Sequence, residues 1–254
     1  MTYPNQDIAL PTGKAGKGAG VIRVFIGADS NEVVAAHVLA HSIIRHSSVP
    51  VCVTPLILGQ LPMTRKKAEY QSTEFSFSRF LVPYLCDFEG RAIFMDCDML
   101  CRTDIKELWK LTNTGYAVSV VKHNYTPKSD IKFLGNRQAR YEKKNWSSLM
   151  VFENSQCREL TPLTVNEATG LYLHQFKWLD SEIGEIPVEW NHLVGEYEKN
   201  PKAKLVHFTL GTPCFKAYDG CEFSDEWHAE KDLMLDYNRI GEYDKLKIVR
   251  HDHG

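Results

Sequence analysis

The sequence lacks the features that mark several specialised classes of protein. No apolar run approaches the roughly 18 residues that a bilayer-spanning helix needs, which excludes such a helix. The 30 basic and 32 acidic side chains nearly cancel, so the net charge of -2 gives no electrostatic reason to expect a nucleic-acid or acidic-membrane partner. The first residues carry Pro4, Asp7 and Pro11 where a secretory signal would be basic and then apolar. We therefore do not expect secretion.

Cysteine is present, but not in a pattern that builds a metal site or a disulfide framework. The seven cysteines are an odd number, are scattered along the chain, and include no Cys-x-x-Cys pair. Reduced thiols in a cytoplasmic protein fit this usage best. Cys97, which stands between two aspartates, is expected to be a small buried side chain rather than a nucleophile.

The chain does contain an alternation of apolar, β-prone segments with helical patterns, which predicts an α/β sheet. The glycine-rich end of residues 1–20 indicates a flexible leader, and residues 21–254 are expected to form one domain. A polar, turn-rich loop is expected at 124–141. We expect strands at 21–26, 51–58, 92–95, 116–121, 148–153, 185–191 and 204–209, and helices at 32–46, 105–109, 167–179 and 225–235.

The stretch from Arg91 to Leu100 is the centre of the predicted sheet. An apolar run after Gly90 indicates a buried strand, and Asp96 and Asp98 follow it directly. At the carboxyl end of a strand, residues i and i+2 project together into the crevice where such sheets bind ligands. Two carboxylates there suit Mg²⁺ or Mn²⁺ beside phosphates. The alternative is a solvated pair in a turn, and the buried strand ahead of the pair argues against it.

The first strand and helix have the outline of a nucleotide-binding unit. The predicted strand ends at Gly27, Ala28 and Asp29, and a helical pattern begins near Glu32. A turn of small residues also occurs wherever a strand passes into a helix, so this signal is weak alone. Asp29 is either a ligand contact or the N-cap of the helix.

Several separated stretches, in order, resemble the family 8 type of retaining glycosyltransferase. That family has a GT-A fold, a Rossmann-like mixed, mainly parallel sheet flanked by helices, with an Asp-x-Asp metal motif. The resemblance covers most of residues 21–216. Its pieces are Gly27 to Asp29, Phe77 to Phe80, Ile93 to Asp98 with Leu108 and Trp109, Asn145 to Asn154, Gln175, Pro187 to Asn191, and His207 to Pro213.

The resemblance implies a transferase that moves a sugar from a nucleoside diphosphate carrier, in the first instance uridine diphosphate, to a carbohydrate or glycoconjugate acceptor. It implies Mn²⁺ or Mg²⁺ held by Asp96, Asp98 and His207, and catalytic roles for Gln175 and Arg79. A separate hypothesis, from its polar character, is that the 124–141 loop closes over donor or acceptor. Donor-binding residues by the same resemblance are Gly27, Ala28, Asp29, Arg79, Asp96, Cys97, Gly211 and Lys216.

Each assignment has a plainer alternative. His207 could be a satisfied buried histidine, Arg79 a surface ion-pair partner, and Lys216 a surface lysine. The chain also departs from the family pattern. Trp146-Ser147-Ser148 stands where the family has Asn-Ser-Gly, Thr212 replaces a lysine, and His174 replaces a carboxylate.

Two other functions compete with the transferase. A catalytically decayed nucleotide-sugar-binding protein on the same fold would explain the departures, but not the intact Asp96, Asp98 and His207. A haloacid-dehalogenase-type phosphatase also carries Asp-x-Asp, but it needs Thr or Val at the position of Leu100 and places this strand first. The segment after Asp225 could dock on the domain or on a membrane surface, and its mixed charge favours the domain.

Overall fold

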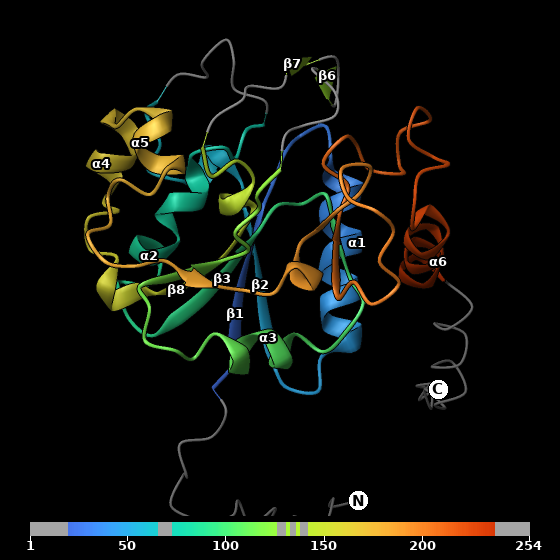
Figure 1. Cartoon of the computed structure of the whole chain (residues 1–254), viewed down its shortest axis with the longest axis horizontal. Coiled ribbons are helices and arrows are strands. Elements are labelled where there is room, and N and C mark those ends of the chain that lie inside the picture. Colours follow the sequence, from blue (N-terminus) through green and yellow to red (C-terminus); the bar gives the residue numbers. More distant parts are fainter. Residues whose placement is uncertain (1–19, 66–72, 126–130, 133–135, 138–141, 237–254) are drawn as a thin grey trace, which may run out of the picture.

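The computed structural model describes residues 20–65, 73–125, 131–132, 136–137 and 142–236 (Figure 1). Only Gly20 of the expected leader lies in these ranges, and the division into leader and domain stays a prediction. The strands are β1 (Ile22–Gly27), β2 (Val51–Leu56), β3 (Arg91–Met95), β4 (Met99–Cys101), β5 (Val118–Val120), β6 (Ile131–Lys132), β7 (Asn136–Arg137), β8 (Leu149–Glu153), β9 (Gly184–Glu185), β10 (His192–Leu193) and β11 (Leu205–His207). The α-helices are α1 (Val33–His46), α2 (Val82–Leu85), α3 (Ile105–Leu111), α4 (Pro162–Glu167), α5 (Gly170–His174) and α6 (Ser224–Leu235).

The main sheet has the strand order β2-β1-β3-β8-β5-β9, with β3 in its interior. β1 pairs in parallel with β2 and β3, and β5 pairs in parallel with β9. Among these six described strands only β8 runs against the others, since it pairs antiparallel with both β3 and β5. The expected mixed, mainly parallel sheet is therefore confirmed.

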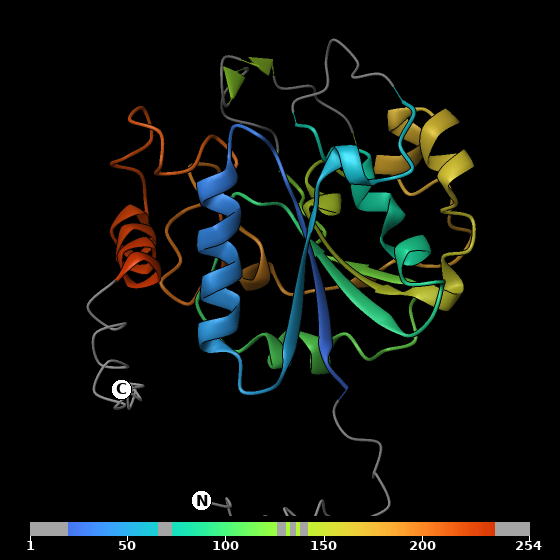
Figure 2. The same cartoon turned by 180° about the vertical axis from the view of Figure 1, so that it is seen from behind.

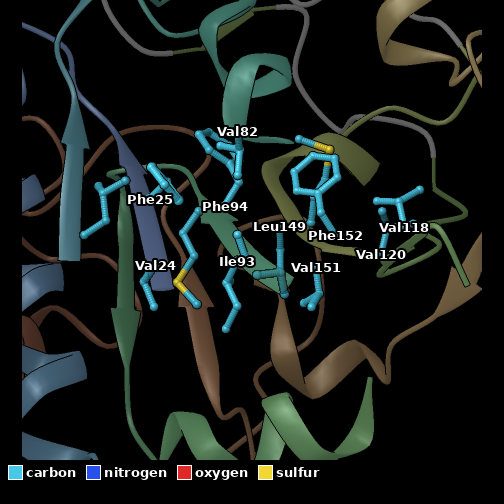
Figure 3. Packing of buried hydrophobic residues seen from close by; sticks show 14 of the residues in the cluster. Val24, Phe25, Val82, Ile93, Phe94, Val118, Val120, Leu149, Val151 and Phe152 are labelled. Atoms are coloured by element: carbon cyan, nitrogen blue, oxygen red, sulfur yellow. The ribbon is translucent and has the colours of Figure 1, made fainter. Parts of the chain in front are cut away.

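The central strands read as unbroken apolar runs because both faces of the sheet are covered. Val24, Ile93 and Val151 lie in register across β1, β3 and β8, and each is at most 2% exposed. Phe94 and Phe152, both fully buried, pack among the same strands (Figure 3). This core fixes the positions at which β1 and β3 end and β8 begins, and the site lies at that edge of the sheet.

Helices cover the sheet from two flanks. Figures 1 and 2 show α1 and α6 side by side on one flank, with α2, α4 and α5 gathered on the opposite side. The buried Glu230 of α6 accepts hydrogen bonds from Arg45 of α1, and its carboxylate lies 2.6 Å from His41 Nδ1. Trp227, also on α6, is fully buried. The expectation that this segment docks on the domain is confirmed for α6, and residues 237–254 lie outside the described ranges.

A second, smaller sheet in the order β10-β11-β4 completes the architecture. β4, which the sequence pattern does not predict, begins directly after Asp98 and pairs antiparallel with β11. His207 thereby lies opposite Met99, and the Phe208 amide donates to the Asp98 carbonyl at 2.8 Å. This sheet brings the late histidine to the aspartates.

Two predicted elements differ in the structure. The expected helix at 167–179 is wrong: α4 ends at Glu167, and α5 is a separate helix that ends at His174. Thr169 caps this new helix by accepting from the Tyr172 amide, and Phe176 has a φ of 57°, which ends it. The expected strand at 185–191 is only β9 followed by a 3-10 turn at Val188–Trp190.

The expected loop at 124–141 is described only in part. β6 and β7 pair antiparallel within it, and residues 126–130, 133–135 and 138–141 lie outside the described ranges. No helix in the described part of the chain combines the length and apolar character that crossing a bilayer requires.

Candidate active site

Three side chains meet at the edge of the main sheet where β1, β3 and β5 end. Asp96 and Asp98 lie in the link between β3 and β4, just beyond the strand rather than in it. One ligand atom from each of Asp96, Asp98 and His207 lies within 4.8 Å of the other two. His207 Nε2 is 3.2 Å from Asp98 Oδ1. Two carboxylates and one imidazole nitrogen are a donor set that Mn²⁺ or Mg²⁺ accepts, so the residues fit the implied ion.

Backbone hydrogen bonds set the height of the two aspartates. The Asp96 amide donates to the Ser148 carbonyl at 2.9 Å, which continues the β3–β8 ladder by one residue. The Phe208 amide, directly after β11 of the smaller sheet, donates a hydrogen bond to the Asp98 carbonyl. The link is thus fixed on both sides, and its carboxylates need no large rearrangement to share an ion.

His207 is buried, at 2% exposed, and each of its ring nitrogens faces a different polar side chain. Its Nδ1 lies 2.9 Å from Asn191 Oδ1, while Nε2 faces Asp98. The alternative of a buried histidine with satisfied hydrogen bonds therefore describes only the Nδ1 side of the ring. A ring held in this way by an amide resembles the outer-shell support that metal-binding histidines commonly have.

Arg79 is not a surface ion-pair partner. It is 6% exposed on the 3-10 turn Ser78–Leu81, and its guanidinium lies 5.2 Å from the Phe75 ring centroid and 5.0 Å from that of Phe94. Nη1 is 2.9 Å from Asp96 Oδ1 and donates to the Ser147 carbonyl at 2.8 Å. A buried cation therefore stands directly beside the first aspartate.

Asp29 is not the N-cap of α1, because that position belongs to Glu32. The Asp29 carboxylate, 4% exposed, accepts from the Asn31 amide at 2.9 Å and from the Glu74 amide at 3.0 Å. It thereby ties the turn after β1, which includes Ala28, to the segment that precedes Arg79. The structure places it beside the cluster, and a contact with a nucleotide stays a proposal.

Gly27, the last residue of β1, is required by packing. A Cβ at this position would collide with the Phe75 ring. The glycine therefore lets the Phe75 ring close over the strand end, and Phe75 in turn supports Arg79. Its expected role in admitting a nucleotide is a further proposal.

Glu32 is a member of the site that sequence reasoning missed. It is 2% exposed, and the Cys97 thiol lies 3.8 Å from its Oε2. Burial, followed by the negative charges of Asp98, Asp29 and Asp96, raises the pKa of Glu32 to about 9. Burial also raises the pKa of the Cys97 thiol well above its ordinary value, which supports the reading of Cys97 as a buried side chain and not a nucleophile.

The carboxyl end of α5 lies against the other side of the cluster. His174 Nδ1 is 2.8 Å from the Ser147 hydroxyl, so the residue that replaces the family's carboxylate contacts the segment that supports Arg79. Gln175 is half-buried, and its carbonyl accepts from Lys143 Nζ at 2.8 Å. Gln175 therefore follows a residue that contacts the site, and among the described interactions none joins it to Asp96, Asp98 or His207.

The turn after β11 is shaped by Gly211. Its φ is 148°, and a Cβ here would collide with the Tyr218 ring, so only glycine fits without strain. Lys216 follows on the same loop and is exposed. The structure does not bring Lys216 into contact with the aspartates among the described interactions, and its phosphate role stays a prediction.

His123 is a second residue that sequence reasoning missed. It follows β5 at the same sheet edge, is 6% exposed, and has Nδ1 2.7 Å from the Tyr197 hydroxyl. Burial and the charge of His207 lower the pKa of His123 to about 3, so the ring is neutral at pH 7. Its Nε2 is buried without a hydrogen-bond partner in the described ranges. A histidine within three residues of the end of a buried strand was the signal that could have found it.

Comparison with known proteins agrees with this geometry. The model of the family described as Glycosyl transferase family 8 matches residues 60–158. Protein CDI of Arabidopsis thaliana is 43% identical over 252 residues, which are 94% of this chain and 96% of that protein.

Solved glycosyltransferase structures share the fold at low sequence identity. The apo bifunctional glycosyltransferase WbbM has a TM-score of 0.57 at 15% identity, over 86% of this chain and 51% of that one. GlyE of Streptococcus pneumoniae TIGR4 has a TM-score of 0.56 at 13% identity, over 87% and 64%. The galactosyltransferase LgtC, in complex with donor and acceptor sugar analogues, has 0.50 at 8% identity, over 83% and 95%. The chain thus spans about half of WbbM and less than two thirds of GlyE.

The mainly parallel sheet and the Asp-x-Asp cluster at its edge define a glycosyltransferase with a GT-A fold. The family match covers Arg79, both aspartates and β8, the segments from which most of the site is built. The chain belongs to glycosyl transferase family 8.

Proposed function

We propose that this glycosyltransferase is metal-dependent and transfers a sugar from a nucleoside diphosphate sugar, a UDP-sugar in the first instance, to a carbohydrate or glycoconjugate acceptor with retention of configuration. The observation that carries the proposal is the cluster of Asp96, Asp98 and His207, whose ligand atoms lie within 4.8 Å of one another. The uridine carrier and retention rest on the family resemblance. The seven free cysteines support a reducing, cytoplasmic setting.

Asp96, Asp98 and His207 would hold Mn²⁺ or Mg²⁺. When bound, the ion acts as a Lewis acid that neutralises the charge developing on the departing diphosphate. Other residues of the chain prepare the site for that anion. Arg79 holds Asp96 in place through its buried ion pair, and its guanidinium adds positive charge where the phosphates would lie.

The remaining residues surround the proposed donor on both sides. Gly27 ends β1, Ala28 and Asp29 follow it, and all three would face the nucleoside, while Gly211 shapes the turn that would approach the phosphates. Gln175, at the end of α5, would lie on the reactive face of the sugar and position it. Positioning and charge stabilisation, rather than proton transfer, are what such a displacement needs from the protein.

Donor hydrolysis by the purified protein tests the proposal, since water can replace an unidentified acceptor. We expect release of UDP from at least one UDP-sugar that needs Mn²⁺ or Mg²⁺ and that Asp96→Ala and Asp98→Ala each abolish. Asp104→Asn is the matched control, because Asp104 caps α3 through the Lys106 amide and asparagine can do the same. Wild-type turnover by either alanine variant would contradict the metal assignment.

The decayed binding protein makes a different prediction in the same assay. It would bind metal and nucleotide without turnover of any donor, including when acceptor sugars are supplied. The phosphatase is not supported, because the Asp-x-Asp strand is β3, preceded by the β1–α1–β2 unit, and the chain belongs to glycosyl transferase family 8.

A further inference from the structure

Ser148 occupies the position at which the family carries a glycine, directly before β8. It is 2% exposed. Its hydroxyl donates to the Asn145 carbonyl at 2.7 Å and lies 2.8 Å from the side-chain amide nitrogen of Asn191. A glycine would supply neither contact, so this hydroxyl is a feature of the present chain.

The direction of each hydrogen bond follows from the Asn145 carbonyl. A carbonyl oxygen only accepts, so the single proton of the Ser148 hydroxyl points at it. Toward Asn191 the hydroxyl can then only accept, which places the amide NH₂ group of Asn191 on the Ser148 side. The amide oxygen must face the other way, toward His207 Nδ1 at 2.9 Å. The orientation of the Asn191 amide is therefore determined by the network.

The same logic continues to the imidazole. The amide oxygen of Asn191 only accepts, so His207 Nδ1 carries a proton and donates it. In the neutral ring the lone pair then resides on Nε2, the nitrogen that faces Asp98 at 3.2 Å. Asn191 is fully buried, and Ser148 and His207 are each 2% exposed. Bulk water therefore does not reach this relay to replace a missing partner.

We propose that Ser148 is a positioning residue that sets the tautomer of His207 through Asn191 and so directs Nε2 to the divalent cation. The inference rests on the proposed metal site. Without the hydroxyl, the amide of Asn191 can turn over and offer its NH₂ group to Nδ1, which moves the ring proton to Nε2 and blocks that nitrogen for metal. The substitution of the family's glycine thus adds a restraint on the metal ligand.

Two measurements on the full chain test the role. Ring ¹⁵N NMR of metal-free protein, with His207 assigned by His207→Gln and the pH raised until its ring is neutral, should show the Nδ1–H tautomer in wild type and a mixture in Ser148→Ala. Calorimetric titration with Mn²⁺ should show weaker binding by Ser148→Ala, by about tenfold, at the low end of outer-shell effects. Ser148→Thr keeps the hydroxyl and should restore both values, if its melting temperature shows that it folds.

Controls separate this role from general packing. Ser119→Ala removes another buried hydroxyl, on β5 against Gly184, and should leave tautomer and Mn²⁺ affinity unchanged. Asn191→Asp keeps an acceptor for Nδ1 and should bind Mn²⁺ far better than Asn191→Leu, which has none.

An unchanged tautomer together with unchanged Mn²⁺ affinity in Ser148→Ala would overturn the inference and leave the metal site standing. Wild-type protein that binds no Mn²⁺ would instead overturn the proposed metal site, and the NMR arm would still decide whether Ser148 sets the tautomer.

Discussion

At the scale of single residues, the site depends on charges that are buried and therefore need fixed partners. Arg79 illustrates this, because its guanidinium is enclosed by Phe75 and Phe94 and bonded to both Asp96 and the Ser147 carbonyl. A planar fork with several donors can serve these partners at once, whereas the ammonium group of lysine is a point charge.

Replacing Arg79 is expected to impair turnover even where the charge is kept. Arg79→Lys should lower kcat/KM for donor hydrolysis by about tenfold and Arg79→Ala by about 100-fold, from charged hydrogen bonds worth about 1.5–3 kcal/mol. Arg65→Lys is the control, since Arg65 also lies over an aromatic ring, 3.7 Å from the Phe77 centroid, but bonds the Val165 carbonyl and not Asp96. A folded Arg79→Ala variant with wild-type kcat/KM would contradict the role.

Glu32 should make the metal-free protein less stable as pH rises. Its folded-state pKa of about 9 exceeds the ordinary value of 4.5, so the unfolded chain loses this proton first. The stability due to Glu32 is fully present below pH 4.5 and declines up to about pH 9, with a slope of at most ~1.4 kcal/mol per pH unit. Urea unfolding in chelator at pH 5, 7 and 9 should show a flatter profile for Glu32→Gln.

The exposed Glu159 provides the comparison for that experiment. Glu159→Gln should keep the wild-type slope. A Glu32→Gln profile that also parallels wild type would show that the Glu32 carboxyl is ionised in the folded, metal-free protein.

At the scale of elements, the docking of α6 on α1 depends on one buried carboxylate. Burial opposes ionisation of Glu230, but hydrogen bonds from Arg45 and His41 outweigh it, and the pKa of Glu230 is lowered. Its stabilising contribution is therefore present above the ordinary glutamate pKa and is lost as pH falls through the lower folded-state value.

Glu230→Gln should lower the free energy of unfolding by about 1–3 kcal/mol at pH 7, because it leaves Arg45 without its carboxylate. The loss should shrink as pH falls below the ordinary glutamate pKa and through the lower folded-state pKa of Glu230. Glu226→Gln, on the same helix, breaks the more exposed pair with Arg102 and should cost less than ~1 kcal/mol. Equal losses for the two variants in chemical unfolding would show that burial of Glu230 does not matter.

The conformation of the turn after β11 depends on Gly211. Gly211→Ala should destabilise the fold by about 1–3 kcal/mol, because alanine disfavours the φ of 148° and its Cβ meets the Tyr218 ring. Gly59→Ala is a matched control, since a Cβ there has no atom within 4 Å. Thermal unfolding of the two variants measures the difference. A Gly211→Ala melting temperature equal to wild type would refute the packing argument.

At the scale of the whole molecule, sequence patterns predict the strands and helices of the main sheet better than they predict the contacts between distant segments. β1, α1 and β3 are recognisable because each is one continuous apolar or amphipathic run. The cluster of Asp96, Asp98 and His207 was predicted only from the family resemblance. The pairing of β4 with β11, which forms it, joins segments about 100 residues apart and leaves no local signal in the sequence.

The residues that sequence reasoning missed are those whose roles depend on their burial in the fold. Glu32 reads as an ordinary first-turn acid until the fold places Asp98, Asp29 and Asp96 around it. Asn191 acts only through contacts with Ser148 and His207. The false helix at 167–179 arose because capping by Thr169 starts a new helix inside an amphipathic pattern.

The most direct test of the whole account is a calorimetric titration of the full chain with UDP. It is done with and without Mn²⁺, on wild type and on Asp98→Asn. The account predicts that wild type binds UDP tightly only with Mn²⁺ and that Asp98→Asn loses this dependence together with the affinity. UDP at 100 times its Kd should then stabilise only the metal-loaded wild type, by about 2.7 kcal/mol. Equal UDP affinity with Mn²⁺ and with chelator, in both proteins, would contradict the claim that the aspartates and His207 hold an ion that receives the donor.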